Sequence, residues 1–403
     1  MRESFGRSAA AICLGTAFLA LTGCVAMDGG RSRSAAVTPV PETPPVSAPS
    51  TGPVIGTGSV KVALLLPLTG SAGAAAAGTS LRNAAELAMS EFSGADLTIL
   101  VKDDRGTAEG ARDAAAAAVA DGAEFIIGPL FAPAVAAAGT VARNAGRPVV
   151  AFSTDVGVAS RGVYLLSFLP QTETARVVDY ASSQGRRSFA ALIPDTTYGS
   201  VVEAEFREAA ARRGARVAAI ERYASGQPAP AVARLASAIG GSNPSADAIF
   251  IPAPPEDLAA IGTALGSAGV NAGRVKPLGT GLWTDPRAGR VPALQGAWYA
   301  APDGAGFATF SSRYRARFGS DPARIATLSY DAVSLAAALA RNPAGSRFTD
   351  ATLGTPTGFA GADGVFRFRA DGTNERSLAV SEIRGEGATV VSPAPKGFGA
   401  PGL

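Results

Sequence analysis

Residues 61–70 read Lys-Val-Ala-Leu-Leu-Leu-Pro-Leu-Thr-Gly, and this apolar run, stopped by a proline and a glycine, decides the fold class. An unbroken apolar run of this length predicts a strand that is buried on both faces, as in a parallel sheet. The alanine-rich stretch 74–92 follows, with Leu81, Ala85 and Ala88 spaced to share one face of a helix. A buried strand followed by a helix is the first unit of an α/β fold.

The alternation of strand and helix then repeats along the chain. Further strands are predicted at 97–101, 125–127, 149–152 and 164–168, and helices at 108–120 and 132–144. The rhythm restarts with helices at 173–183, 200–213, 231–239 and 256–268 and strands at 189–193, 216–220 and 248–251. Alternation of this kind predicts parallel pairing. Two doubly wound parallel-sheet lobes account for it.

The pattern loosens after Pro277. Two long helices are predicted at 305–318 and 325–341, and a strand-rich segment at 364–391. Within that segment, residues 365–369 alternate between apolar and basic side chains and are followed by Asp371 and Gly372, which indicates a hairpin.

The start of the chain has the parts of an export signal. Arg2 and Arg7 precede an apolar run at 9–20 that is too short to span a membrane. The sequence Leu-Thr-Gly-Cys at 21–24 resembles the lipobox of bacterial lipoproteins, in which the cysteine is acylated and becomes the first mature residue. We expect residues 1–23 to be a signal peptide and Cys24 to be lipidated. The alternative is a plain secretory signal with an incidental cysteine.

Two segments are too rich in proline, glycine and small residues to belong to a core. Residues 24–59 are predicted to form a disordered tether, which would extend by about 3 Å per residue. Residues 392–403 are predicted to be a flexible tail.

Composition excludes several classes of protein. The chain contains no histidine, so histidine-dependent catalysis and zinc sites with imidazole ligands are excluded. Cys13 lies in the predicted signal, which leaves no internal disulfide, and interspersed charges with a net +3 do not indicate nucleic-acid binding. Asp103 and Asp104 form the best adjacent carboxylate pair, but neighbours at a strand end point to opposite sides. Enzymes without histidine exist, so a carboxylate-pair hydrolase stays possible at this point; together with the resemblance described next, we expect a protein that is not an enzyme and has no cofactor or metal.

Several motifs in order resemble those of the type 1 periplasmic solute-binding proteins of the Leu/Ile/Val-binding kind. The motifs lie at 63–70, 102–104, 126–129, 195–199, 330–333 and 366–368 with Asp371-Gly372, and the resemblance runs from about residue 60 to 391. It implies two α/β lobes joined by three crossovers, with a ligand cleft at the carboxyl ends of the strands. The first lobe is expected to comprise 60–169 and 298–355, and the second lobe 170–297 and 356–391.

The resemblance places six loops at that cleft, and open parallel sheets bind ligands at this edge for physical reasons too. The loops are 69–73, 128–133, 153–158, 196–199, 252–255 and 280–285. Receptors of the family typically supply a serine after the third strand and a threonine after the fourth. The corresponding positions here hold Phe131 or Ala132 and Asp155, which makes an amino acid pocket less expected, although Ser153 and Thr154 could substitute.

Other loop residues suit a ligand by their chemistry. Asp155 and Asp285 could bind an ammonium group, while Tyr198 and Trp283 offer apolar platforms with polar edges. Tyr198 could equally pack against the neighbouring helix. The candidate cleft residues are Thr69, Ser71, Phe131, Ser153, Thr154, Asp155, Tyr198, Trp283 and Asp285.

The departures at Phe131 and Asp155 favour a second branch of the superfamily. This branch resembles penicillin-binding protein activators, lipoproteins that regulate peptidoglycan synthesis, and its partner would be a penicillin-binding protein. Val25 after Cys24 is not the aspartate that commonly retains lipoproteins in the inner membrane, so we expect a periplasmic protein anchored to the outer membrane. The alternative is the substrate-binding lipoprotein of an ABC importer for branched-chain amino acids or amides, with an ABC permease as partner and a small-molecule ligand. A carboxylate-dependent hydrolase is a third, less favoured, class.

Overall fold

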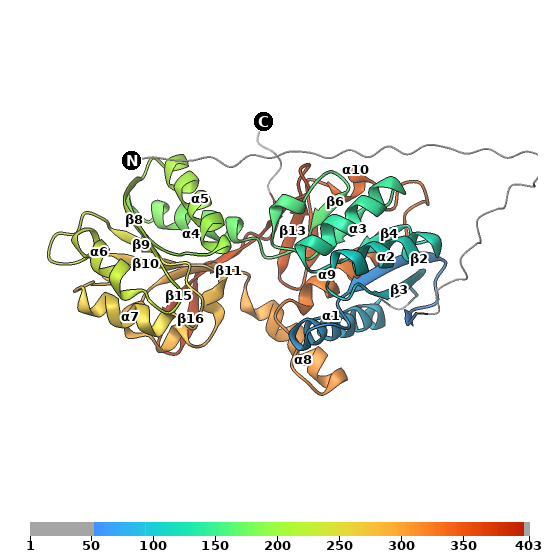
Figure 1. Cartoon of the computed structure of the whole chain (residues 1–403), viewed down its shortest axis with the longest axis horizontal. Coiled ribbons are helices and arrows are strands. Elements are labelled where there is room, and N and C mark those ends of the chain that lie inside the picture. The colour runs from blue at the N-terminus through green and yellow to red at the C-terminus, as the bar shows by residue number, and fades with distance from the viewer. Residues whose placement is uncertain (1–51, 93, 399–403) are drawn as a thin grey trace, which may run out of the picture. The chain divides into compact units, whose positions relative to one another are not determined.

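The computed structural model describes residues 52–92 and 94–398 and contains two large sheets and one small one. The predicted signal peptide, Cys24 and most of the predicted tether lie outside the described residues. We call each large sheet with its helices a lobe, and Figure 1 shows the elements of both.

The first lobe is built on a six-stranded sheet in the order β1-β3-β2-β4-β5-β6. Strands β2 to β6 are parallel, and the short β1 pairs antiparallel with β3 at the edge. The strands are β1 (Val54–Ile55), β2 (Val60–Leu66), β3 (Leu97–Asp103), β4 (Phe125–Ile127), β5 (Val149–Ala151) and β6 (Val163–Leu165). The helices are α1 (Ala72–Glu91), α2 (Ala108–Ala120), α3 (Ala132–Asn144), α8 (Gly304–Phe318), α9 (Ala326–Leu339) and α10 (Asp350–Leu353).

The apolar run of β2 is buried on both faces, as its sequence predicts. Leu64 and Leu66 pack with α1 and α9, whereas Ala63 and Leu65 pack with α2 and α3. Buried alanines line both α2 and α3, and small side chains let these helices lie close to the sheet and to each other.

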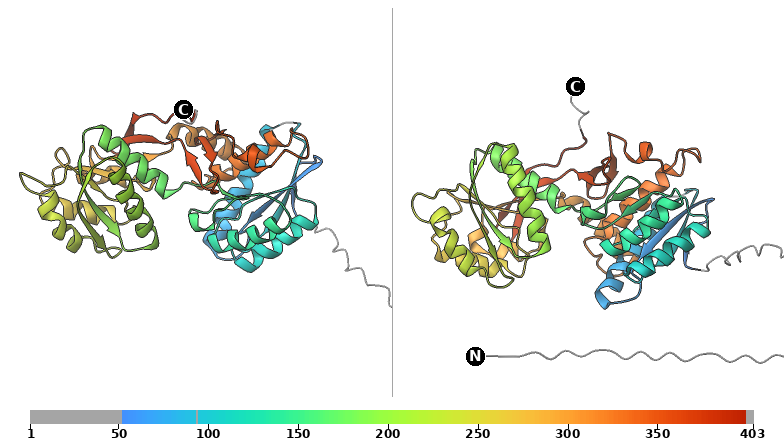
Figure 2. Two further views of the ribbon diagram at one scale, coloured as in Figure 1. Left: turned by 90° about the horizontal axis from the view of Figure 1, so that it is seen from above. Right: turned by 45° about the horizontal axis from the view of Figure 1, so that its top comes forward.

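The second lobe is built on a seven-stranded sheet in the order β16-β15-β11-β10-β9-β7-β8. Its five parallel strands are β7 (Ser188–Pro194), β8 (Arg216–Tyr223), β9 (Ala248–Phe250), β10 (Lys276–Gly279) and β11 (Trp298–Ala301); β15 (Ala379–Arg384) and β16 (Gly387–Ser392) are antiparallel. Helices α4 (Pro170–Ser183) and α5 (Thr197–Arg212) cover one face, and α6 (Ala229–Ile239) and α7 (Leu258–Ser267) the other. Figure 2 shows these helices on both sides of the strands.

The third sheet is an antiparallel hairpin structure of β12 (Phe359–Gly361), β13 (Gly364–Phe368) and β14 (Asn374–Arg376). Phe366 and Phe368 belong to the apolar core of the first lobe. Between the described strands and helices, the chain passes from one lobe to the other at residues 166–169, 302–303 and 377–378. Two doubly wound lobes with three crossovers, the predicted fold class, are therefore confirmed.

The residues at which the chain passes from one lobe to the other differ from the predicted lobe boundaries. β11 at Trp298–Ala301 lies in the second sheet, although residues 298–355 were expected in the first lobe. Conversely, β12 to β14 pack on the first lobe, although residues 356–391 were expected in the second. β11 has only four residues and follows short 3-10 turns in place of a helix, so its sequence does not continue the rhythm that guided the prediction.

Both predicted unstructured segments are partly ordered. Residues 52–59 run along β3, where β1 pairs Val54 with Leu100 and the Ser59 hydroxyl donates to Asp96 at 2.6 Å. At the other end, the Pro395 carbonyl accepts a hydrogen bond of 2.6 Å from Ser377. The tether and tail predictions are wrong for these residues, because sheet edges and side chains of the body supply partners that the composition does not reveal.

Candidate functional site

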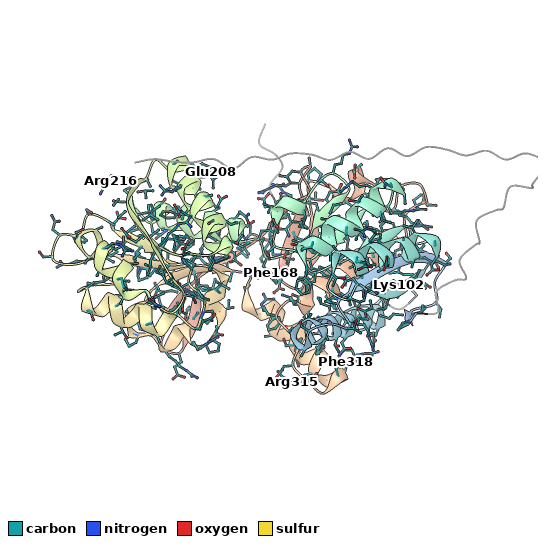
Figure 3. All side chains as sticks on the ribbon, in the orientation of Figure 1. Lys102, Phe168, Glu208, Arg216, Arg315 and Phe318 are labelled. Atoms are coloured by element: carbon teal, nitrogen blue, oxygen red, sulfur yellow. The ribbon has the colours of Figure 1, made fainter. Side chains whose placement is uncertain are left out.

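A cavity of about 290 Å³ lies where the two lobes meet, and we call it the cleft cavity. Its walls come from the loop after β5, the first two crossovers, and the starts of α4 and α5. The turn after β10 and the segment before α9 complete it. The lining residues are Thr154, Phe168, Pro170, Glu173, Tyr198, Gly281, Leu282, Thr284, Ala301, Pro302 and Arg324. Figure 3 labels Phe168 between the two lobes.

Glu173 is the buried acid of this cavity. It lies in the first turn of α4, and its Oε2 accepts a hydrogen bond of 2.9 Å from the backbone N–H of Gly281. Burial raises the pKa of its carboxyl to about 7, against the opposing effects of the Gly281 hydrogen bond and the positive charge of Arg324. Glu173 therefore titrates near neutral pH and can either donate a hydrogen bond or neutralise a cation.

The glycine at position 281 leaves room for the Glu173 carboxyl in its present place. A Cβ on Gly281 would lie 2.5 Å from Oε1 of Glu173, so any larger residue would displace the carboxyl. The turn after β10 thus both binds Glu173 and fixes how deep it lies.

Arg324 supplies the positive charge. Its Nη1 and Nη2 each donate to the buried Asp363 at 2.8 Å, which forms a bidentate pair. The guanidinium carbon lies 4.5 Å from the ring centres of both Phe168 and Phe307. A guanidinium held by a carboxylate and two aromatic rings is fixed in place before any ligand arrives.

Tyr198 forms part of the apolar wall. It follows the Thr196 cap at the start of α5, and its hydroxyl is 2.9 Å from the Thr280 hydroxyl. Burial raises the pKa of the tyrosine, so it stays neutral. Its ring is also packed against the apolar core beneath α4 and α5, which agrees in part with the packing alternative.

The arrangement suits binding of a small, polar molecule. The cavity has roughly the volume of ten water molecules and lies at the lower end of the range for small-molecule sites. It combines a fixed cation, a buried carboxyl and aromatic walls. Its lining residues include no serine, cysteine or lysine.

Some predicted cleft residues line this cavity and others have structural contacts instead. Thr154 and Tyr198 line the cavity. Thr69 donates a hydrogen bond to Asp103 at 2.5 Å, and Ser71 caps α1 through the N–H of Ala74.

The other candidates lie outside the cavity lining. Ser153 accepts a hydrogen bond from the N–H of Asp155, whose own carboxylate accepts one from Gly157. Phe131 is 39% exposed at the start of α3. Asp285 pairs with Arg287, whose guanidinium lowers the pKa of the aspartate to about 2.

Trp283 lies in the apolar core of the second lobe. It is 2% exposed, and a Cβ on Gly279 would lie 2.2 Å from its ring. The prediction of a cleft platform is wrong for this side chain, because a glycine in β10 leaves room for the indole to turn inward.

Sequence analysis missed Phe168, Glu173 and Arg324. Glu173 was included in a predicted helix, and Arg324 lies at the edge of another, far along the chain from the other cleft residues. The available signals were an acid in the first turn of a helix that follows a crossover, and an arginine that precedes a buried helix.

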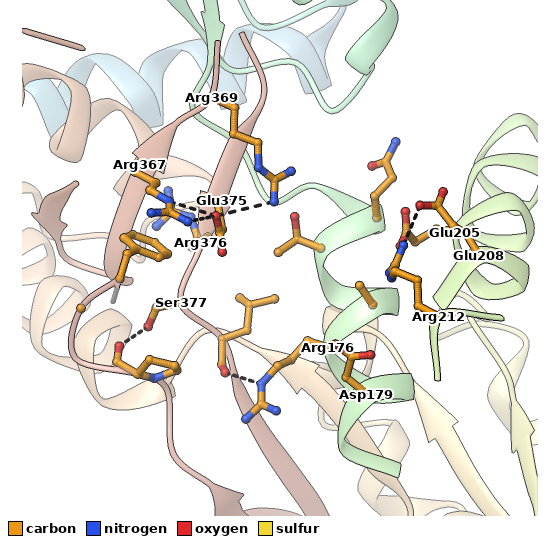
Figure 4. Close-up of a pocket in the computed structure, with 17 residues that line it drawn as sticks. Arg176, Asp179, Glu205, Glu208, Arg212, Arg367, Arg369, Glu375, Arg376 and Ser377 are labelled. Atoms are coloured by element: carbon orange, nitrogen blue, oxygen red, sulfur yellow. Dashed lines mark hydrogen bonds and ion pairs between the residues drawn. The ribbon is translucent and has the colours of Figure 1, made fainter. Parts of the chain in front are cut away.

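A larger cavity of about 660 Å³ lies on the opposite face of α4, and we call it the outer crevice. Figure 4 shows its charged residues on β13, β14, α4 and α5. Most of them pair with one another: Arg212 with Glu205 and Glu208, and Arg367 with Glu375. The exception is the buried Arg376, which lies 3.6 Å from Asp331 and whose guanidinium nitrogens have no hydrogen-bond partner within the described residues.

The sequence model of the periplasmic binding protein family matches residues 59–388. This span is most of the chain, so the protein belongs to that family. Its members are solute-binding proteins, and the fold is that of the type 1 Leu/Ile/Val-binding kind. No curated protein matches the sequence.

Solved structures share the fold at low sequence identity. One from Rhodospirillum rubrum, described as a branched-chain amino acid ABC transporter, has a TM-score of 0.73 and 24% identity and covers 82% of this chain and 99% of its own. An ABC transporter substrate-binding protein from Desulfitobacterium hafniense, in complex with leucine, has a TM-score of 0.59 and 18% sequence identity. It covers 82% of this chain and 99% of its own. A Rhodopseudomonas palustris solute-binding protein in complex with 3,4-dihydroxybenzoic acid has a TM-score of 0.59 and 21% sequence identity. It covers 84% of this chain and 97% of its own.

Two other features are absent from the part of the chain that the structure describes. No helix within residues 52–92 and 94–398 is long and apolar enough to cross a membrane. In the same part of the chain, no group of three acidic, cysteine or histidine residues could hold a metal ion.

Proposed function

We propose that this protein is the solute-binding component of an ABC importer, with an amino acid of the branched-chain type as its ligand. The observation that carries the proposal is the pairing of groups in the cleft cavity: Glu173 can neutralise an ammonium group, and Arg324 can bind a carboxylate. Phe168, Tyr198 and Leu282 provide apolar surface for a side chain.

The free hydrogens of Arg324 support this assignment. The pair with Asp363 uses one hydrogen each on Nη1 and Nη2, Nη1 also donates to the Thr327 hydroxyl at 3.4 Å, and within the described residues Nε has no acceptor. A ligand carboxylate can therefore bind without breaking the pair with Asp363. Family membership and structural relatives that bind leucine also support it.

A second candidate ligand is an aromatic acid without an amino group. Two aromatic walls beside a guanidinium would suit benzoate-like molecules, and two solved relatives are complexes with such acids. The two ligand classes require different protonation states of the Glu173 carboxyl. An ammonium ligand requires the ionised carboxyl, whereas an acid alone prefers the protonated one.

The partner in this proposal is an ABC permease, and the protein works in the periplasm, anchored through Cys24. The main prediction from sequence, an activator of a penicillin-binding protein at the outer membrane, has less support than the importer. The feature that disfavoured a receptor was the residue types at Phe131 and Asp155, and neither lines the cleft cavity.

Calorimetric titration of the purified protein with leucine, benzoate, amides and muropeptides at pH 6, 7 and 8 tests the proposal. Below pH 7 the affinity for an amino acid should fall by up to about tenfold per pH unit, because Glu173 becomes protonated. The affinity for benzoate should rise instead. Binding of muropeptides alone would contradict the importer and favour the activator.

A further inference from the structure

The last described residues cross from the second lobe to the first. They leave the second sheet at β16, where Arg176 of α4 donates to the Ser392 hydroxyl at 2.6 Å. The Pro395 carbonyl then accepts from Ser377 in the third crossover. Finally, the Phe398 ring lies 4.5 Å from the guanidinium of Arg367 on β13, which belongs to the first lobe.

The cation that meets Phe398 is fixed. Arg367 donates to Glu375 through Nε at 2.9 Å and Nη2 at 2.7 Å, and Nη1 contacts the Pro356 carbonyl at 3.3 Å. A guanidinium held in one plane gives the ring a defined face to pack against. By contrast, Lys396 between the two contacts is exposed to solvent.

These contacts line the outer crevice, whose position opposes that of the cleft cavity. Pro170 and Glu173 on α4 face the cavity, while Thr172, Arg176 and Asp179 face the crevice. Because the two spaces lie on opposite faces of the helix that follows the first crossover, a rotation that narrows one widens the other. The cavity reaches solvent here, since Thr154, Leu282 and Thr284 are exposed.

We propose that residues 393–398 form a strap, a non-covalent fourth link between the lobes, which holds the conformation with an open cleft cavity. Closure of the cavity on a solute widens the crevice and breaks the contact between Phe398 and Arg367. The strap therefore lowers solute affinity, since part of the binding free energy is used to release it. This effect on affinity rests on the proposed function.

The first test measures the distance between the lobes without any solute. The described body contains no cysteine, so paired spin labels can be placed at Arg112→Cys on α2 and Ser237→Cys on α6, with Cys13 and Cys24 replaced by serine. Both Phe398→Ala and a chain that ends at Ser392 should shift or broaden the distance distribution. Lys396→Ala is the matched control and should leave it unchanged. Identical distributions in all variants would overturn the strap.

The second test measures affinity for leucine and benzoate by calorimetry. We expect Phe398→Ala and the shortened chain to bind the solute roughly threefold to tenfold more tightly than the parent and Lys396→Ala. Changed distances with unchanged affinity would contradict the role in binding. If neither solute binds any variant, the proposed function fails, and the distance measurement still decides whether the strap exists.

Discussion

The cleft cavity and the outer crevice lie on opposite faces of α4, and the charged side chains that line them differ in how far they are paired with one another. In the crevice, most arginines and carboxylates pair with one another, as Arg212 does with Glu205, and the buried Arg376 is the exception. In the smaller cavity, Glu173 is buried, accepts a single recorded hydrogen bond within the described residues, and has a pKa near 7. The difference teaches that volume alone does not identify a binding site, because most charges of the larger crevice already have partners while the acid of the smaller cavity has a pKa shifted toward neutrality.

Replacing Arg324 should have the largest effect on both stability and solute affinity. Arg324→Gln leaves the buried Asp363 carboxylate without its cation, which should lower the free energy of unfolding by about 2–4 kcal/mol. Solute binding should also be lost, because the ligand carboxylate has no cation. Urea unfolding and calorimetry measure the two effects.

A double variant separates them. Arg324→Gln with Asp363→Asn removes both charges and should recover most of the stability, but none of the solute affinity. Recovery of affinity in the double variant would show that Arg324 is not a ligand contact.

The second-largest effect should be the change in the free energy of unfolding with pH that comes from Glu173. Its folded pKa of about 7 exceeds the ordinary value of 4.5, so its contribution to stability is fully present below pH 4.5 and is lost as pH rises through 7. The total loss is about 3 kcal/mol. In Glu173→Gln the fall in stability should be smaller by this amount but still present, because the buried Asp331 and Asp104 also have raised pKa values, of about 7 and about 6; urea unfolding at pH 4.5, 6 and 8 measures it. Parallel pH profiles for the parent and the variant would mean that Glu173 is not buried as described.

A smaller change at Gly281 tests the position of the carboxyl. Gly281→Ala introduces a Cβ that displaces Glu173 and breaks its hydrogen bond, so solute affinity should fall by several-fold, equivalent to about 1 kcal/mol. Gly304→Ala is a suitable control, because a Cβ there meets no atom within 4 Å. Equal affinities in the two variants would contradict the described contact.

The smallest effect is expected in the outer crevice. Arg212→Gln removes ion pairs to Glu205 and Glu208 at a site where the arginine is 44% exposed. It should change the free energy of unfolding by less than about 1 kcal/mol and leave solute affinity unaltered. A loss of affinity like that of Glu173→Gln would reverse the comparison between the two cavities.

Most of the fold could be predicted because buried parallel strands such as β2 have unbroken apolar sequences. β1 and β11 could not, for different reasons. β1 has two residues and depends on the exposed edge of β3, while β11 follows 3-10 turns that interrupt the strand and helix rhythm. The position of the β12–β14 hairpin was also missed, since Phe366 and Phe368 show an apolar face but not which lobe receives it.

The cleft cavity was predictable only where it lies at strand ends. Thr154 and Tyr198 follow β5 and β7 directly, so topology places them at that edge. Phe168 and Arg324 come together through packing of segments far apart in the sequence, which one sequence does not encode as a pattern. Trp283 shows the converse, because an aromatic residue in a loop turns into the core when a glycine leaves space.

The pairing of β1 with β3 has a mechanical consequence. Because β1 is antiparallel to β3, the described chain begins beside Val101, near the end of β3 that leads toward the cleft. A pull on the chain ahead of residue 52 would load the short β1 ladder before it reaches the buried β2. Residues 52–59 would peel away first and add about 25 Å of reach while both lobes stayed intact. β1 would therefore be the first strand of the body to detach under such a load.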